Sequence, residues 1–223
     1  MGAMTEEIEP ILEYMDDLKT EQIGQNRYHT GTIGKKAVAA AYSRIGKVNA
    51  AVTASVLIER FGIEKLLFSG VAGAINKRLH IGDLIYASTL VQHDVDITAF
   101  GHPLGFIPET GDFFASDQAL NAIAEEVALK LKIPLGSGVI ATGDQFIADE
   151  KKKRWIAEKY KADAVEMEGA AVACVCNAFN VPFFVLRAIS DAADMDAEFN
   201  FDAFLKSSAA ISADFVINMV EML

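Results

Sequence analysis

Short apolar segments rich in β-branched and aromatic residues alternate along this chain with longer segments in which apolar positions recur every three to four residues. The short segments predict strands over residues 37–42, 65–69, 83–91, 138–142, 162–165 and 182–189. The longer segments predict helices over residues 48–61, 118–131, 150–159, 169–179 and 201–222. This alternation is typical of an α/β fold in which helices cover both faces of a parallel or mixed sheet. No linker, repeat or low-complexity tract interrupts residues 1–223, which predicts one domain.

The helix predicted over residues 169–179 is apolar on all sides, so we expect it to be buried. Glu168 precedes it directly, where the helix dipole favours an anion. This carboxylate has two interpretations, since it either binds a ligand or only caps the helix. Residues 187–191, Arg-Ala-Ile-Ser-Asp, end an apolar strand, which is where open α/β proteins bind their ligands. Charged groups beside an apolar core acquire shifted pKa values suited to acid–base chemistry.

Two further segments at strand ends carry candidate binding groups. The strand over residues 65–69 runs into a predicted turn with Gly70 and Gly73, where backbone can approach a ligand closely. This turn lacks the dinucleotide fingerprint, the phosphate-loop lysine and any other cation, so we expect a ligand without a bound phosphate. Residues 143–147, Gly-Asp-Gln-Phe-Ile, follow another strand. Phe146 there suits a flat heterocycle, although a lone Phe more often belongs to the core.

Residues 99–108 form a predicted loop with two prolines, two glycines and several large apolar side chains. Apolar loops of this kind cover a pocket or a neighbouring subunit, and the alternative is an ordinary packed Ω-loop.

Composition narrows the classes of partner. The chain has 223 residues, is 52% hydrophobic and carries a net charge of −11, so it buries a sizeable core but repels phosphate backbones and anionic membranes. The basic run at residues 151–154 lies among acidic residues and is expected to be a solvated helix face. No apolar run reaches the roughly 18 residues of a membrane span, and the N-terminus does not resemble a signal peptide. We therefore expect a cytoplasmic protein that contacts neither nucleic acid nor membrane.

Taken in order along the chain, six motifs resemble those of the bacterial 5′-methylthioadenosine/S-adenosylhomocysteine nucleosidases, a branch of the purine nucleoside phosphorylase and nucleosidase superfamily. They are Gly-Ala-Met-Thr-Glu-Glu-Ile (2–8), Ser-Gly-Val-Ala-Gly (69–73), Thr-Ala-Phe-Gly (98–101), Gly-Asp-Gln-Phe-Ile (143–147), Val-Glu-Met-Glu (165–168) and Arg-Ala-Ile-Ser-Asp (187–191). The resemblance implies a central mixed sheet, partly closed into a barrel and flanked by helices, in a homodimer. It also implies hydrolysis of the N-glycosidic bond of 5′-modified adenine nucleosides without a metal or organic cofactor.

The resemblance assigns the catalytic roles as follows. Asp191 is the general acid that protonates N7 of adenine, with Ser190 orienting it. Glu7 holds and activates the water, with Arg187 nearby. Acid and base on opposite sides of the sugar would stabilise an oxocarbenium-like transition state and invert the anomeric carbon.

It likewise assigns the binding roles. Glu168 binds the ribose hydroxyls, Met167 packs under the sugar, Phe146 stacks on adenine and the backbone of Ile147 reads its edge. Ile45 lines the pocket for the 5′ substituent, and Phe100, His102 and Pro108 close that pocket on the partner subunit. Further expected contacts to the nucleoside are Ala3, Val71, Glu166 and Phe201.

Two positions depart from the family pattern. An apolar strand usually precedes Gly-Ala-Met, whereas only Met1 precedes it here. Two alternatives follow: the sequence starts within that strand, or the first strand is missing before residue 2. Val71 stands where many relatives carry Ser. The sequence leaves three alternatives open: a phosphorylase on the same fold, a non-catalytic adenosine-binding protein, and, through the His-Pro-Leu-Gly-Phe loop, an enzyme that also cleaves 6-amino-6-deoxyfutalosine on the way to menaquinone.

Overall fold

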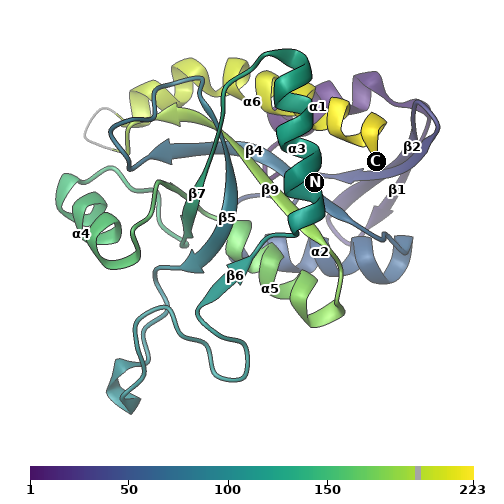
Figure 1. Cartoon of the computed structure of the whole chain (residues 1–223). Helices are drawn as coiled ribbons and strands as arrows, with labels where there is room; N and C mark the ends of the chain where they lie inside the picture. The colour runs from purple at the N-terminus through teal and green to yellow at the C-terminus, as the bar shows by residue number, and fades with distance from the viewer. Residues whose placement is uncertain (194–196) are drawn as a thin grey trace.

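A central mixed sheet closes on itself as a five-stranded barrel (Figure 1). The structure is a computed structural model and describes residues 1–193 and 197–223. The barrel strands, in spatial order, are β5 (Leu84–Gln92), β7 (Leu135–Thr142), β8 (Ala164–Glu166), β4 (Leu66–Ala74) and β9 (Phe183–Asp191). β9 pairs again with β5 and so closes the ring, and β6 (Phe113–Ala115) extends it from β5. Parallel and antiparallel pairs are mixed around the ring, as the resemblance implied.

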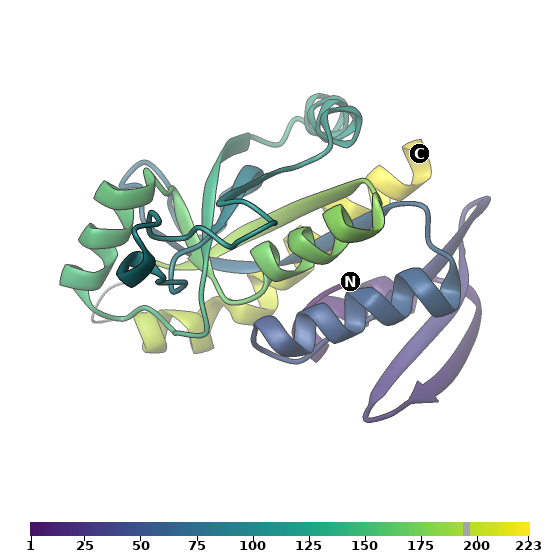
Figure 2. The same ribbon diagram turned by 90° about the horizontal axis from the view of Figure 1, so that it is seen from below.

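Helices cover the sheet on both faces, which confirms the predicted α/β fold with helices on both sides of a mixed sheet (Figures 1 and 2). They are α1 (Thr5–Tyr14), α2 (Lys47–Phe61), α3 (Gln118–Leu131), α4 (Glu150–Tyr160), α5 (Gly169–Phe179) and α6 (Ala197–Met222), with a short 3-10 helix η1 (Thr98–Phe100). α2 and α5 lie on one face, and α1, α3 and α6 lie on the other, each with its own apolar cluster. The acidic N-caps that start α3 and α4, Asp117 and Asp149, accept hydrogen bonds from amides in the first turn. α6 begins at Ala197 rather than at the predicted Phe201.

A second, antiparallel sheet of three strands lies beside the barrel. It contains β1 (Asp16–Ile23), β2 (Asn26–Ile33) and β3 (Lys36–Ala41), of which only β3 was predicted. β1 is exposed along almost its whole length, so its sequence lacks the alternation that marks a half-buried strand. The missed signal is a pair of two-residue turns that begin with Gly24 and Gly34, both at positive φ.

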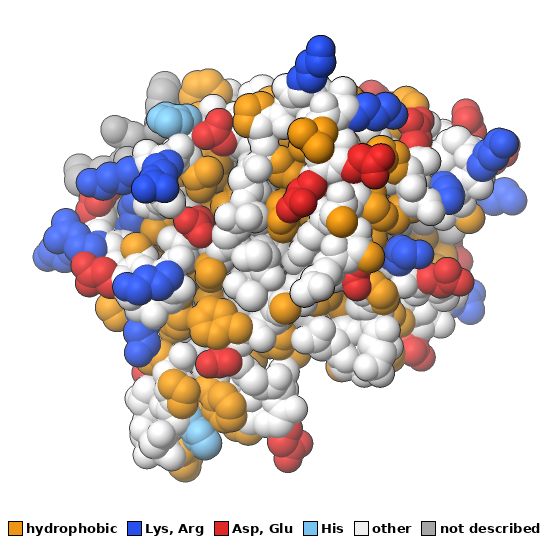
Figure 3. Space-filling model, in the orientation of Figure 1, with side chains coloured by type: hydrophobic (Ala, Val, Ile, Leu, Met, Phe, Trp, Pro, Cys, Tyr) orange, Lys and Arg blue, Asp and Glu red, His pale blue; other side chains and the backbone are white. Residues whose placement is uncertain are grey.

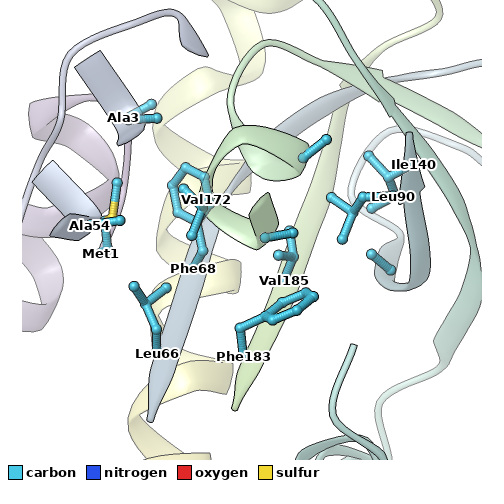
Figure 4. Packing of buried hydrophobic residues seen from close by; sticks show 14 of the residues in the cluster. Met1, Ala3, Ala54, Leu66, Phe68, Leu90, Ile140, Val172, Phe183 and Val185 are labelled. Atoms are coloured by element: carbon cyan, nitrogen blue, oxygen red, sulfur yellow. The ribbon is translucent and has the colours of Figure 1, made fainter. Parts of the chain in front are cut away.

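The N-terminal segment joins the two sheets. The Met1 carbonyl accepts the Ser69 amide of β4, while the Gly2 amide donates to the Ala41 carbonyl of β3. These residues pair as a single bridge and not as a regular strand, so residues 1–3 occupy the space between β3 and β4. Figure 4 shows Met1 and Ala3 within the same apolar cluster as Phe68.

The predicted turn at residues 69–73 is wrong, because β4 continues through it to Ala74. Gly70 pairs with Arg187 and Gly73 with Asp191 on β9, and Gly73 also pairs with Val165 on β8. These glycines are therefore strand residues, and the reason for them lies in the cavity described below.

One described helix segment, Phe201–Met222, is long and apolar enough to span a membrane, with a mean hydropathy of 1.3 in its most apolar window. Half of that window is buried, because α6 packs against β4, β9 and α1. Packing of this kind is expected of a helix that belongs to the protein core.

Candidate active site

A cavity of about 320 Å³ opens where β4, β8 and β9 approach α1 and α6. Twelve of the residues predicted from the sequence line it: Ala3, Glu7, Ile45, Val71, Phe146, Ile147, Glu166, Met167, Glu168, Ser190, Asp191 and Phe201. The fold therefore brings together residues up to 198 positions apart in the chain. A cavity of this size accommodates a small-molecule ligand.

Glu7 stands in the first turn of α1 and is buried, with 2% of its surface exposed. Its Oε2 accepts the amides of Ala3 (2.6 Å) and Met4 (3.0 Å), and its Oε1 accepts the Val71 amide (3.0 Å). Burial raises the pKa of Glu7, while Arg187 and these three amides oppose the rise. The carboxylate is thus fixed in position, in surroundings that favour its taking up a proton.

Asp191 ends β9 and is buried. Its Oδ2 accepts the Ser190 hydroxyl at 2.9 Å, and its Oδ1 accepts the Ala193 amide at 2.8 Å. The side chain of Ser190 therefore holds the carboxyl group of Asp191 in one orientation.

Gly70 and Gly73 leave the space that these two carboxylates occupy. A Cβ atom at Gly70 would lie 2.7 Å from Glu7 Oε1, and one at Gly73 would lie 2.7 Å from Asp191 Oδ1. The sequence had suggested that these glycines admit a ligand close to the backbone. The structure shows that both admit the acidic side chains, and Gly73 also lines the cavity.

Glu166 and Arg187 form a buried ion pair beside the cavity. Arg187 Nη2 lies 2.7 Å from Glu166 Oε2, and its guanidinium stacks over Phe68. Glu166 Oε2 also accepts the amides of Glu168 and Gly169, and Oε1 accepts the Thr142 hydroxyl. Glu166 lines the cavity, whereas Arg187 lies behind it and does not. Both charges are therefore neutralised within the protein.

Glu166, and not Glu168, supplies the acceptor for the first amides of α5. Glu168 occupies the N-cap position of that helix without making a side-chain capping bond. Its Oε1 instead accepts the amide of Gly46 at 2.7 Å, across the cavity rim. Burial, with the nearby charge of Glu166, raises the pKa of Glu168 to about 8. The interpretation of Glu168 as a simple helix cap is therefore wrong.

The opposite wall of the cavity is apolar and partly open. Phe146, with 47% of its surface exposed, meets the ring of Phe201 edge-on at a centroid distance of 5.7 Å. Ile147 is buried, and Met167 and Ile45 complete this lining. An aromatic face beside apolar side chains suits a planar heterocycle.

The segment after Asp191 is anchored by a lysine from the basic run. Lys153 Nζ donates to the Ala192 carbonyl at 2.5 Å, with 14% of the Lys153 side chain exposed. The prediction of a wholly solvated basic face is therefore wrong at this position. Residues 194–196 lie outside the described part of the chain.

The predicted loop residues Phe100, His102 and Pro108 do not line the cavity of this chain. They lie on a segment between β5 and β6 that projects from the body of the protein, where Figure 3 shows gathered hydrophobic side chains. Phe100 is 82% exposed, and the ring of His102 stacks on Phe106.

Four lining residues were missed: Met4, Ala72, Gln145 and Val165. Each adjoins a predicted residue in sequence, so the motifs themselves were the signal. Within the described residues, neither Lys nor Arg lines the cavity, and no cluster of three His, Cys, Asp or Glu side chains is arranged to hold a metal ion. The arrangement is thus one of four carboxyl groups, one of them paired with Arg187, around an uncharged wall. This suits acid–base chemistry and stabilisation of a cation.

Comparison with known proteins places this fold and site in a family. The profile of the Phosphorylase superfamily matches residues 1–221. The aminodeoxyfutalosine nucleosidase of Campylobacter jejuni is 54% identical, over 100% of this chain and 97% of the relative. The 5′-methylthioadenosine/S-adenosylhomocysteine nucleosidase of Bacillus thuringiensis is 37% identical over the same shares. The nucleosidase of Neisseria meningitidis, solved with methylthio-immucillin-A, superposes with a TM-score of 0.98 at 38% identity, covering 100% of this chain and 97% of that one.

The chain belongs to the phosphorylase superfamily. Within that superfamily, the relatives compared above at 37–54% identity over the full chain are nucleosidases of adenine nucleosides.

Proposed function

We propose that this protein hydrolyses the N-glycosidic bond of 5′-modified adenine nucleosides and releases adenine. It is an N-glycosidase, in line with its nucleosidase relatives. The observation that carries the proposal is that Glu7 and Asp191 reach one cavity from different elements, α1 and β9, while no described cation lines it. A phosphorylase would need positive charge to hold phosphate there, whereas buried carboxylates repel that anion.

Asp191 protonates N7 of adenine as the bond between N9 and the anomeric carbon breaks. The bonding electron pair leaves with the base, so the added proton prevents a build-up of negative charge on adenine. The Ser190 hydroxyl holds Asp191 in place, and the aromatic face of Phe146 supports the base.

Glu7 binds the attacking water and accepts its proton as the oxygen bonds to the anomeric carbon. The sugar is cationic in the transition state, so the nearby anionic carboxylates stabilise it in a low-dielectric cavity. Glu168 binds the ribose hydroxyls, because its second oxygen carries no described bond after Oε1 has accepted the Gly46 amide. Attack on the face opposite to the base inverts the anomeric carbon.

A homodimer completes the site in this proposal. Phe100, His102 and Pro108 project away from their own cavity on an apolar loop, as expected of residues that cover the 5′-substituent pocket of a partner. We place the enzyme in the cytoplasm, because its acidic surface and free cysteines suit a reducing, soluble environment.

Aminodeoxyfutalosine is among the proposed substrates, beside methylthioadenosine, S-adenosylhomocysteine and 5′-deoxyadenosine. Support comes from the 54% identity to an aminodeoxyfutalosine nucleosidase. A solved 5′-methylthioadenosine/S-adenosylhomocysteine nucleosidase is 55% identical, so identity does not rank these substrates. Steady-state kcat/KM values for the four nucleosides would rank them.

The decisive experiment is adenine release by the purified protein, with and without inorganic phosphate. We expect release at the same rate in both, with free sugar as the product. Asp191→Asn should lower kcat by at least ~100-fold, whereas the exposed Asp214→Asn on α6 should leave it unchanged. Dependence on phosphate, with sugar 1-phosphate as the product, would indicate a phosphorylase. Nucleoside binding without any cleavage by the wild type would indicate a binding protein.

A further inference from the structure

The amide that holds Glu168 belongs to the N-terminus of α2. Gly46, the N-cap of this helix, adopts a φ of +102° and donates to Glu168 Oε1 at 2.7 Å. No side chain of α2 caps this end. Whatever fixes the start of α2 therefore also fixes the proposed ribose-binding carboxylate.

Three charged residues fix that start. The Lys47 amide donates to Asp144 Oδ1 at 2.8 Å, and the Asp144 amide donates to Asp94 Oδ2 at 2.9 Å. Lys47 Nζ in turn donates to Asp94 Oδ1 at 2.6 Å and to Gln92 Oε1. We call Lys47, Asp94 and Asp144 the polar clasp.

The ion pair within the clasp is shielded from solvent, with only 17% of the Lys47 side chain and 15% of the Asp94 side chain exposed, whereas Asp144 is exposed. Burial alone would raise the pKa of Asp94, but the bonds from Lys47 and Asp144 outweigh it and hold that pKa below its ordinary value. An ion pair with this degree of burial and three further hydrogen bonds restrains geometry more than an exposed pair does.

The clasp also holds the wall opposite Glu168. Asp144 is followed directly by Gln145, Phe146 and Ile147, which line the cavity. The neighbouring His93 ring packs so closely against Gly143 that a Cβ there would lie 2.4 Å from its Nε2. Residues 92–94 at the end of β5 thus support the segment 143–147 from beneath, as well as α2.

We infer that Asp94, through the polar clasp, is a positioning residue that sets the placement of Glu168 on the Gly46 amide relative to the 143–147 wall. This inference rests on the proposed function for the role of Glu168. Misplacement of about 1 Å in such a group costs up to ~100-fold in rate.

The test combines Asp94→Asn with Glu168→Gln. Asparagine keeps the shape of Asp94 but loses its charge and one acceptor oxygen. We expect Asp94→Asn to lower kcat/KM for methylthioadenosine ~10- to 100-fold and to weaken binding of methylthio-immucillin-A. In the Glu168→Gln background the same change should weaken that binding by a clearly smaller factor, because the charged carboxylate is gone and only the support of the 143–147 wall remains to be lost.

The matched control is Glu21→Gln, which breaks the Arg60–Glu21 pair of 3.1 Å on the exposed surface and should change neither quantity. Circular dichroism and a thermal melt show that each variant is folded. The positioning role would be overturned if Asp94→Asn weakened inhibitor binding equally in the wild-type and Glu168→Gln backgrounds, or did not weaken it at all. Either result would leave the proposed hydrolysis intact. If the wild type releases no adenine, the proposed reaction is refuted. Binding of methylthio-immucillin-A to the two single variants and the double variant then still tests the positioning role of Asp94.

Discussion

The raised pKa of Glu168 links activity to stability in a way that can be measured. Burial, with the nearby charge of Glu166, lifts this pKa from 4.5 to about 8. Between these values the folded protein retains a proton that the unfolded chain has released. Stability therefore falls as the pH rises through this interval, and the loss is complete only above the raised pKa.

The magnitude follows from 1.36 kcal/mol for each unit of pKa shift. Between pH 5 and pH 8, Glu168 should cost the folded wild type on the order of 3 kcal/mol. Glu168→Gln removes the titration, while the Gln carbonyl still accepts the Gly46 amide. The variant should thus become more stable than the wild type as the pH rises, although it loses the carboxylate that we propose for ribose binding.

Urea unfolding of both proteins at pH 5, 6, 7 and 8 measures this difference. The free energies of unfolding should nearly coincide at pH 5 and diverge in favour of Glu168→Gln by pH 8. Glu126→Gln, on an exposed face of α3, controls for the loss of a negative charge and should follow the wild type. Parallel pH profiles for Glu168→Gln and the wild type would refute the reasoning.

Two further predictions concern the packing behind the site. Gly73→Ala should lower kcat at least ~10-fold, because its Cβ would lie 2.7 Å from Asp191 Oδ1. The control Gly136→Ala in β7 meets nothing closer than 3.5 Å and should be tolerated. A kcat for Gly73→Ala equal to that of the wild type would show that Asp191 has room to move. Arg187→Met should lower the free energy of unfolding in urea by about 3–5 kcal/mol, because it leaves the buried Glu166 carboxylate unpaired. Adding Glu166→Gln should recover part of that loss. If the losses of the two single variants simply add in the double variant, the two side chains do not stabilise each other.

The sequence predicted the residues of the site better than their arrangement. Phe146, Glu168 and Asp191 were predictable because chemistry-bearing residues that follow apolar strands stand out against a buried core. The sequence could not predict that Glu166 accepts the first amides of α5 while Glu168 does not, since both residues precede this helix and only tertiary contacts decide which one caps it.

The missed elements have similar physical causes. β1 has polar residues on both faces, so periodicity could not mark it. Gly70 and Gly73 resemble turn residues, and only their nearness to Glu7 and Asp191 shows why a strand carries them. The Gly46–Glu168 bond joins residues 122 positions apart, beyond the reach of any local pattern.

Closure of the barrel has a consequence for how a ligand enters and leaves. A closed ring of hydrogen-bonded strands has no free edge at which it can open, so β4, β8 and β9 form one stiff frame that holds Glu166 and the proposed acid Asp191. The half-exposed Phe146 and its edge-on partner Phe201 belong to segments outside that frame. Motion during turnover should therefore concentrate at this aromatic wall, so inhibitors can vary more freely where they meet Phe146 than where they meet Asp191.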